Sequence, residues 1–83
     1  MSYRISFKSS VYKDLKKIDR TQADNILNEI EKELSENPEY FPQLSGNFSG
    51  LRKFRIGNYR IIYTILDDIV LILRISHRKD AYR

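Results

Sequence analysis

The chain has 83 residues, the size of one small domain with a single hydrophobic core, so we expect residues 1–83 to form one domain. Its hydrophobic fraction of 41% suffices for such a core, and no run reaches the roughly 18 apolar residues of a membrane helix. The absence of cysteine and the single histidine exclude a disulfide framework and the usual ligand sets of structural zinc. We therefore predict neither a metal nor another cofactor.

The positive charge is concentrated in the C-terminal part of the chain. There are 15 Lys and Arg residues against 11 Asp and Glu residues, a net charge of +4. Residues 51–83 hold eight of the basic residues and three of the acidic ones, a net charge of +5, which leaves −1 for residues 1–50. Clustered cations attract polyanions such as nucleic acid, although a solubilising surface is the alternative. Because no leader sequence is visible, we expect a cytoplasmic protein.

The N-terminal half predicts one strand and two helices. Residues 3–7 (YRISF) alternate apolar and polar side chains, as a half-buried strand does. Apolar residues then recur at helical spacing over residues 11–18 and again over 23–34. Two antiparallel helices are therefore expected.

Hydroxyl side chains suggest where these helices begin. Ser9 or Ser10 is the expected N-cap of the first helix, because a hydroxyl oxygen there accepts a free backbone N–H. Thr21 is the expected N-cap of the second, with Asp24 three residues later as an acidic variant of the capping box.

The C-terminal half predicts an antiparallel meander. Its three β-rich segments are LRKFRI (51–56), YRIIYTIL (59–66) and IVLILRIS (69–76). Gly57-Asn58 and Asp67-Asp68 are typical turn sequences between them. The order β-α-α-β-β-β predicts an α+β fold, an antiparallel sheet with both helices packed on one face.

A two-residue loop at the first hairpin would place basic residues opposite each other. Ile56 would then pair with Tyr59, Arg55 would lie directly across from Arg60, and Lys53 would share their face. Like charges at such a position destabilise a sheet by roughly 0.2–1 kcal/mol. No carboxylate occurs in these two segments, so we interpret the face as a site for an external anion.

Apolar and aromatic residues alternate on the other face of these strands, which is the pattern of a core. They are Phe54, Ile56, Tyr59, Ile61, Tyr63 and Ile65. Stacking of Tyr59 or Tyr63 on nucleic-acid bases is the alternative, but aromatic stripes at strand spacing are more often buried.

The stretch GLRKFRIGNYRIIY, followed after one more strand by HRKDAY, resembles the RelE branch of the RelE/ParE toxin superfamily. The resemblance covers the whole chain, with its specific motifs in the C-terminal third, and the β-α-α-β-β-β order agrees with it. It implies a ribosome-dependent endoribonuclease that cuts messenger RNA in the ribosomal A site. It also implies a partner, a RelB-like antitoxin that holds the toxin inactive.

The resemblance also assigns roles to individual residues. The family's two essential arginines fall on Arg60 and Arg78, its C-terminal tyrosine on Tyr82, and a basic catalytic position on Lys53. The family's best-known member has lysine where His77 stands. The remaining basic residues are expected to contact RNA phosphates, and they are Arg52, Arg55, Arg74, Lys79 and Arg83.

The residues limit how such a cleavage could proceed without metal. It requires activation of the ribose 2′-OH, stabilisation of a pentavalent phosphorane and protonation of the leaving oxygen. Two histidines would serve, but the chain has one. Surrounding cations favour the phenolate of Tyr82 as the base, while Arg60 and Arg78 fork onto phosphate oxygens. His77 is the rival base, and a structural role or a phosphate contact is the alternative for it.

Two other functions remain open at this level. A ParE-like toxin would share the fold but inhibit DNA gyrase by binding it. An RNA-binding module, or a decayed toxin without catalysis, would use the same basic face without turnover. Fold alone does not decide function within such a superfamily.

Overall fold

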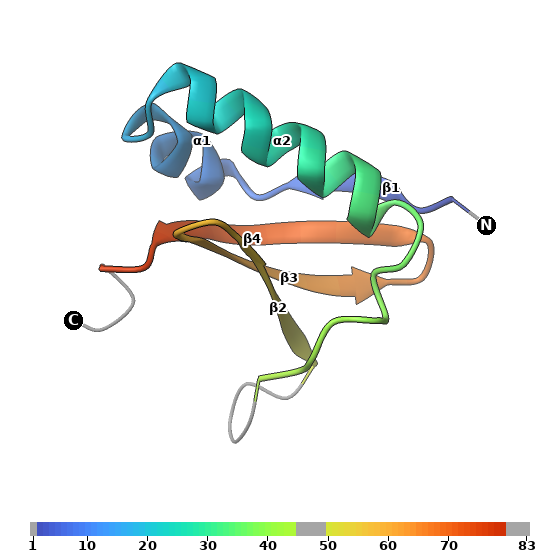
Figure 1. Cartoon of the computed structure of the whole chain (residues 1–83). Coiled ribbons are helices and arrows are strands. Elements are labelled where there is room, and N and C mark those ends of the chain that lie inside the picture. The colour runs from blue at the N-terminus through green and yellow to red at the C-terminus, as the bar shows by residue number, and fades with distance from the viewer. Residues whose placement is uncertain (1, 45–49, 80–83) are drawn as a thin grey trace.

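The computed structural model describes residues 2–44 and 50–79, which form a four-stranded sheet with two helices on one of its faces (Figure 1). In chain order the elements are β1 (Arg4–Phe7), α1 (Ser9–Lys16), α2 (Arg20–Leu34), β2 (Leu51–Ile56), β3 (Tyr59–Leu66) and β4 (Ile69–His77). The strand order across the sheet is β1-β4-β3-β2. The predicted α+β fold and the β-α-α-β-β-β order are confirmed.

The sheet is mixed, which differs from the wholly antiparallel sheet that the sequence predicted. β2, β3 and β4 form the expected antiparallel meander, but β1 pairs with β4 in parallel, with Arg4 opposite Ile69. Two neighbouring strands that run parallel need a long connection between them. Here the connection from β1 to β4 contains both helices and the strands β2 and β3. As a result, β4 is paired on both sides, with β3 on one side and β1 on the other.

The two helices begin differently from the prediction. Lys8 occupies the N-cap of α1 without a side-chain hydrogen bond, and Ser9 and Ser10 lie inside the helix. The N-cap of α2 is Asp19, whose Oδ2 accepts a hydrogen bond from the backbone N–H of Thr21 (3.2 Å). A carboxylate at this position both accepts an unpaired N–H and interacts favourably with the positive end of the helix dipole, so Asp19 replaces Thr21 as the cap.

The core lies between the sheet and the helices. On α2, Ile26, Ile30 and Leu34 follow one another at intervals of four residues, so they line the same side of the helix. The fully or almost fully buried apolar residues are Val11, Ile26, Ile30, Leu34, Phe54, Ile61, Tyr63, Val70, Ile72 and Ile75. Ile56, Tyr59 and Ile65 pack against this core, so the predicted apolar face of the meander is confirmed.

A β-bulge in β4 changes which side chains face the helices. Ile62 pairs with Arg74, but the next residue, Tyr63, pairs with Ile72, so Leu73 has no partner on β3. The extra residue reverses the alternation beyond it. Ile72 and Ile75 are therefore both buried, although three positions separate them.

Beyond the end of β1, the edge of β4 is completed by a side chain of α1. The parallel pairing of β1 reaches only as far as Ile72. Further along β4, the backbone N–H of Ile75 donates to Oδ2 of Asp14 (3.1 Å). This bond ties the C-terminal part of β4 to α1, because it satisfies a donor that no strand pairs.

Tyr63 is buried in the core with its hydroxyl group bonded to the backbone. The hydroxyl donates to the carbonyl of Pro38 (2.5 Å), which ties the chain after α2 to the centre of the sheet. Burial raises the pKa of Tyr63 to about 12, although the charge of Arg52 opposes the rise.

Replacement of Tyr63 by phenylalanine should lower the free energy of unfolding by about 0.5–1.5 kcal/mol at neutral pH, because one buried hydrogen bond is lost. In the wild type, the tyrosine of the unfolded chain has its ordinary pKa of 10.0 and so releases its proton before the folded one does. Stability should therefore fall as pH rises from 10 toward 12, and this component should be missing from Tyr63→Phe. Urea unfolding of both proteins between pH 8 and 11.5 measures the difference, and parallel pH profiles would contradict the prediction.

Candidate functional site

Three arginines meet in a hollow at the tip of the β2–β3 hairpin. Its volume is about 200 Å³, and its lining residues are Arg55, Gly57, Asn58, Tyr59, Arg60 and Arg78. We call it the arginine hollow. It combines residues from both strands of the hairpin and from the segment that follows β4.

The hairpin places two of the arginines opposite each other. Ile56 pairs with Tyr59 and Arg55 with Arg60, so the predicted register and the two-residue loop Gly57-Asn58 are confirmed. Gly57 has a φ of +57°, a conformation that a residue without Cβ adopts at low cost and that suits the first position of a tight hairpin. The short loop therefore determines that both guanidinium groups leave the same face of the sheet.

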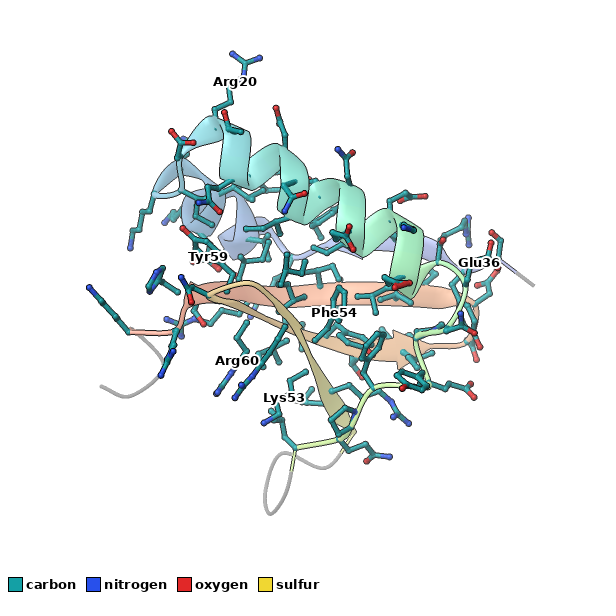
Figure 2. All side chains as sticks on the ribbon, in the orientation of Figure 1. Arg20, Glu36, Lys53, Phe54, Tyr59 and Arg60 are labelled. Atoms are coloured by element: carbon teal, nitrogen blue, oxygen red, sulfur yellow. The ribbon has the colours of Figure 1, made fainter. Side chains whose placement is uncertain are left out.

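This face is the one that the helices leave uncovered. In Figure 2, Arg60 and Lys53 point away from the helices, whereas Tyr59 points toward them. Ile62, two residues after Arg60 on β3, lies on the same face. It pairs with Lys53 of β2 and with Arg74 of β4. We call this surface the open face; its charged members are Lys53, Arg55, Arg60 and Arg74.

Arg78 reaches the hollow because a backbone bond holds it beside the hairpin. Its N–H donates to the carbonyl of Asn58 (2.6 Å), the second residue of the β2–β3 loop. Arg78 is the first residue after β4, and β4 ends opposite Tyr59. The strand end and the hairpin tip thus bring Arg60 and Arg78, 18 positions apart, to one site.

No carboxylate neutralises these arginines within residues 2–44 and 50–79. The ion pair found there joins Arg4 to Asp68 (3.7 Å), and neither Arg55, Arg60 nor Arg78 takes part in one. Three guanidinium groups around a hollow of this size provide a dense set of N–H donors and positive charge. The arrangement is suited to a phosphate group, which planar guanidinium groups bind through paired hydrogen bonds.

Arg52 lies apart from the hollow and holds the chain that precedes β2. Its Nη1 atom donates to the carbonyl oxygens of Phe41 (2.6 Å) and Glu39 (3.2 Å). Because side chains alternate along a strand, Arg52 projects from the helix side of the sheet, whereas Lys53 and Arg55 project from the open face. The structure therefore does not bring Arg52, an expected RNA contact, together with the other arginines.

His77 also lies outside the hollow. It pairs with Tyr59 across the sheet, and the two rings pack edge to face with centroids 5.1 Å apart. It lines a second, smaller cavity of about 80 Å³, together with Asp14 of α1 and Lys17, the C-cap of that helix. His77 is thus on the helix side of the sheet, while Arg60 is on the open face.

The other predicted site residues are distributed around the hollow or fall outside the described range. Lys53 and Arg74 lie on the open face but do not line the hollow, and Arg74 and Lys79 are exposed. Tyr82 and Arg83, a predicted catalytic residue and a predicted RNA contact, lie outside the described residues.

Three residues of the hollow were not predicted as part of the site, and they are Gly57, Asn58 and Tyr59. Tyr59 was assigned to the core alone, yet it lines the hollow and supports His77. Asn58 was treated as a turn residue, yet its carbonyl anchors Arg78. Strand alternation did not indicate Tyr59, because its side chain points to the helix side of the sheet, and nothing in the sequence indicated the backbone bond of Asn58.

Two classes of feature are missing from residues 2–44 and 50–79. No helix in this part of the chain is long and apolar enough to cross a membrane. Nor do three or more His, Asp or Glu side chains in these ranges gather where they could hold a metal ion.

Comparison with known proteins identifies relatives of the whole chain. Residues 5–82 match the family described as ParE toxin of type II toxin-antitoxin system, parDE. The toxin RelG of Mycobacterium tuberculosis is 32% identical over 90 residues, an alignment that covers 100% of this chain and 99% of the relative.

Solved structures show the same fold. The toxin-antitoxin complex RelBE2 of M. tuberculosis contains a chain with a TM-score of 0.84 and 29% identity, covering 94% of this chain and 100% of that one. The archaeal RelE-RelB complex of Pyrococcus horikoshii gives a TM-score of 0.68 at 27% identity, over 94% and 97% of the two chains. The free Escherichia coli RelE mutant R81A/R83A, at 16% identity, shares the fold with a TM-score of 0.79 over 99% and 90%. The chain therefore belongs to the RelE/ParE family of toxins from type II toxin-antitoxin systems, within its RelE-like branch.

Proposed function

We propose that this toxin is a ribosome-dependent endoribonuclease that cuts messenger RNA in the ribosomal A site and so stops translation in the cytoplasm. The observation that carries the proposal is the arginine hollow, where Arg55, Arg60 and Arg78 line about 200 Å³. Among the described residues these three arginines have no carboxylate partner. Such a site favours a ligand that brings its own negative charge, as the scissile phosphate of RNA does.

Arg60 and Arg78 would stabilise the transition state by binding the phosphate from two sides. Attack of the 2′-oxygen on phosphorus adds negative charge to the non-bridging oxygens, and the bond to the leaving 5′-oxygen then breaks. Guanidinium groups that are already in place stabilise this charge without reorganising during the reaction. The backbone bond between Arg78 and Asn58 contributes to this pre-organisation, since it holds the strand end against the hairpin.

Proton transfer would involve two further side chains. In this proposal the phenolate of Tyr82 accepts the proton of the 2′-OH, and the ammonium group of Lys53 approaches the leaving oxygen from the open face. Arg55, Arg74, Lys79 and Arg83 would bind neighbouring phosphates, which makes their contribution sensitive to salt. Arg52 is the exception, because its guanidinium is engaged by the carbonyls of Glu39 and Phe41.

A RelB-like antitoxin is the proposed regulatory partner. The M. tuberculosis and P. horikoshii structures to which this chain is similar are complexes of a toxin with its antitoxin. The open face carries Lys53, Arg55, Arg60 and Arg74, so an acidic segment that covers it would block phosphate binding. A disordered antitoxin that folds on binding would have the necessary reach.

Inhibition of DNA gyrase is the second candidate function, because the matched family is described as ParE toxin. The relatives named above favour ribonuclease activity, since they are RelG and RelE toxins. A gyrase inhibitor would also have no need to gather arginines from a hairpin and a strand end around one hollow.

Primer extension on messenger RNA tests the proposal. The purified toxin is added to translating ribosomes and, in parallel, to naked RNA, with Arg78→Ala as the inactive control. We expect cuts at A-site codons with ribosomes and wild-type toxin. If folded wild-type protein produced no cuts in either reaction, the proposal would fail, and inhibition of gyrase supercoiling would be assayed next.

A further inference from the structure

The C-terminal end of β4 carries a contact that bears on the position of Arg78. The backbone N–H of Lys79 donates a hydrogen bond to Nδ1 of His77, with a distance of 3.1 Å. The ring thus reaches over Arg78 and binds the residue that follows it. Two hydrogen bonds therefore restrain the backbone at Arg78. One is this bond of Lys79, and the other joins the N–H of Arg78 to the carbonyl of Asn58 (2.6 Å).

We infer that His77 is a positioning residue: its ring accepts the Lys79 N–H and thereby holds Arg78 at the arginine hollow. The inference rests on the proposed ribonuclease function for its consequence in catalysis. The hydrogen bond between Lys79 and His77 that supports the inference is found in the structure of the toxin by itself.

The ring of His77 is well placed to act as a fixed support. It packs edge to face on Tyr59, with the ring planes at 87° and the centroids 5.1 Å apart. Beyond Tyr59, the small cavity around it is lined by Asp14, Lys17, Ile18 and the end of β4. Because the bond from Asp14 to the Ile75 N–H ties α1 to β4, the surroundings of the ring are themselves anchored.

The same geometry argues against His77 as the group that moves a proton in the reaction. His77 pairs with Tyr59, and neighbouring positions on a strand point to opposite faces. Arg60 pairs with Ser76 and faces the open side, where the arginine hollow lies. In addition, Nδ1 already accepts a backbone N–H, so this nitrogen is occupied and does not face a substrate.

Two substitutions separate the two roles. In His77→Asn, the side-chain oxygen lies where Nδ1 was, and asparagine readily accepts the N–H of the residue two positions later. In His77→Gln, the polar atoms lie near the former position of Nε2 and leave the Lys79 N–H without its acceptor. Neither side chain titrates, so proton transfer is lost in both variants, while the Lys79 bond is retained only in His77→Asn.

The cleavage assay should therefore rank the variants. His77→Gln and His77→Ala should lose about 10²-fold in cleavage rate, because a displaced guanidinium no longer meets the phosphate. His77→Asn should rescue most of this loss. Equal loss in His77→Asn and His77→Gln, or no loss in any variant, would overturn the inference.

A measurement without cleavage keeps the test independent of the proposed function. Nitrogen-15 spectra of the His77 ring in the wild-type toxin should show Nδ1 unprotonated and Nε2 protonated, and the Lys79 amide should exchange more slowly than in His77→Gln. A ring protonated on Nδ1 in the neutral state would overturn the positioning role even if the toxin cleaves. If the toxin does not cleave, the expected spectra still support the contact, while the ribonuclease proposal fails separately. Circular dichroism of each variant confirms that it is folded.

Discussion

Substitution of Arg60 or Arg78 by alanine is expected to lower ribosome-dependent cleavage by about 10²–10³-fold, the usual effect of removing one group that stabilises transition-state charge. Both side chains line the arginine hollow, and neither belongs to the buried core. The variants should therefore fold as the wild type does. Single-turnover cleavage on programmed ribosomes, with unfolding by urea as the companion measurement, checks both parts.

The double variant shows whether the two arginines act on one phosphate. If they do, the loss in Arg60→Ala/Arg78→Ala should be smaller than the product of the single losses, because groups that act as a unit are not additive. Arg20→Ala is the matched control. Arg20 is exposed on the helix side, as Figure 2 shows, and its substitution should leave cleavage unchanged. Cleavage at the wild-type rate by Arg60→Ala would contradict the assignment of the hollow as the active site.

Truncation of Ile72 to alanine is expected to cost about 2–5 kcal/mol of the free energy of unfolding. Ile72 is fully buried and lies in the middle of β4, next to the bulge. The cavity left behind would remain largely unfilled, since the surrounding core residues restrict its collapse. A domain of this size has only about 5–15 kcal/mol of stability in total, so the variant should be largely unfolded at low concentrations of urea.

Leu66→Ala is the control for this effect. Leu66 is 52% exposed at the end of β3, and its truncation should change stability by less than about 0.5 kcal/mol. Equal urea midpoints for the two variants would show that Ile72 is not packed as the structure places it.

Much of the fold was predictable because local patterns determine it. The helical spacing of Ile26, Ile30 and Leu34 and the alternation along residues 51–66 each match one burial pattern. The turn at Gly57-Asn58 then set the register that places Arg55 opposite Arg60. The parallel pairing of β1 was missed because the direction of β1 relative to β4 depends on the path that the chain takes through the two helices, and no local pattern records this path.

The position of His77 shows where local patterns fail. With a regular β4 starting from the pair Leu66 and Ile69, Arg60 would pair with Ile75, and His77 would share its face. The bulge at Leu73 shifts the pairing by one residue, so His77 instead faces the helices. The run Val70–Leu73 is entirely apolar, and a run without alternation contains no signal for the point at which the faces reverse.

By itself, the sequence determined the order of the elements, most of the core and the basic face of the hairpin, because each depends on residues close together in the chain. Only the tertiary structure decided which distant residues meet there. Arg78 joins Arg60 through a backbone bond to Asn58, Arg52 is turned toward the carbonyls of Glu39 and Phe41, and His77 is placed behind the sheet. The physical reason is the same in the three cases. Strand register and hydrogen bonds to backbone groups of other segments set these positions, and they form only when the whole sheet is assembled.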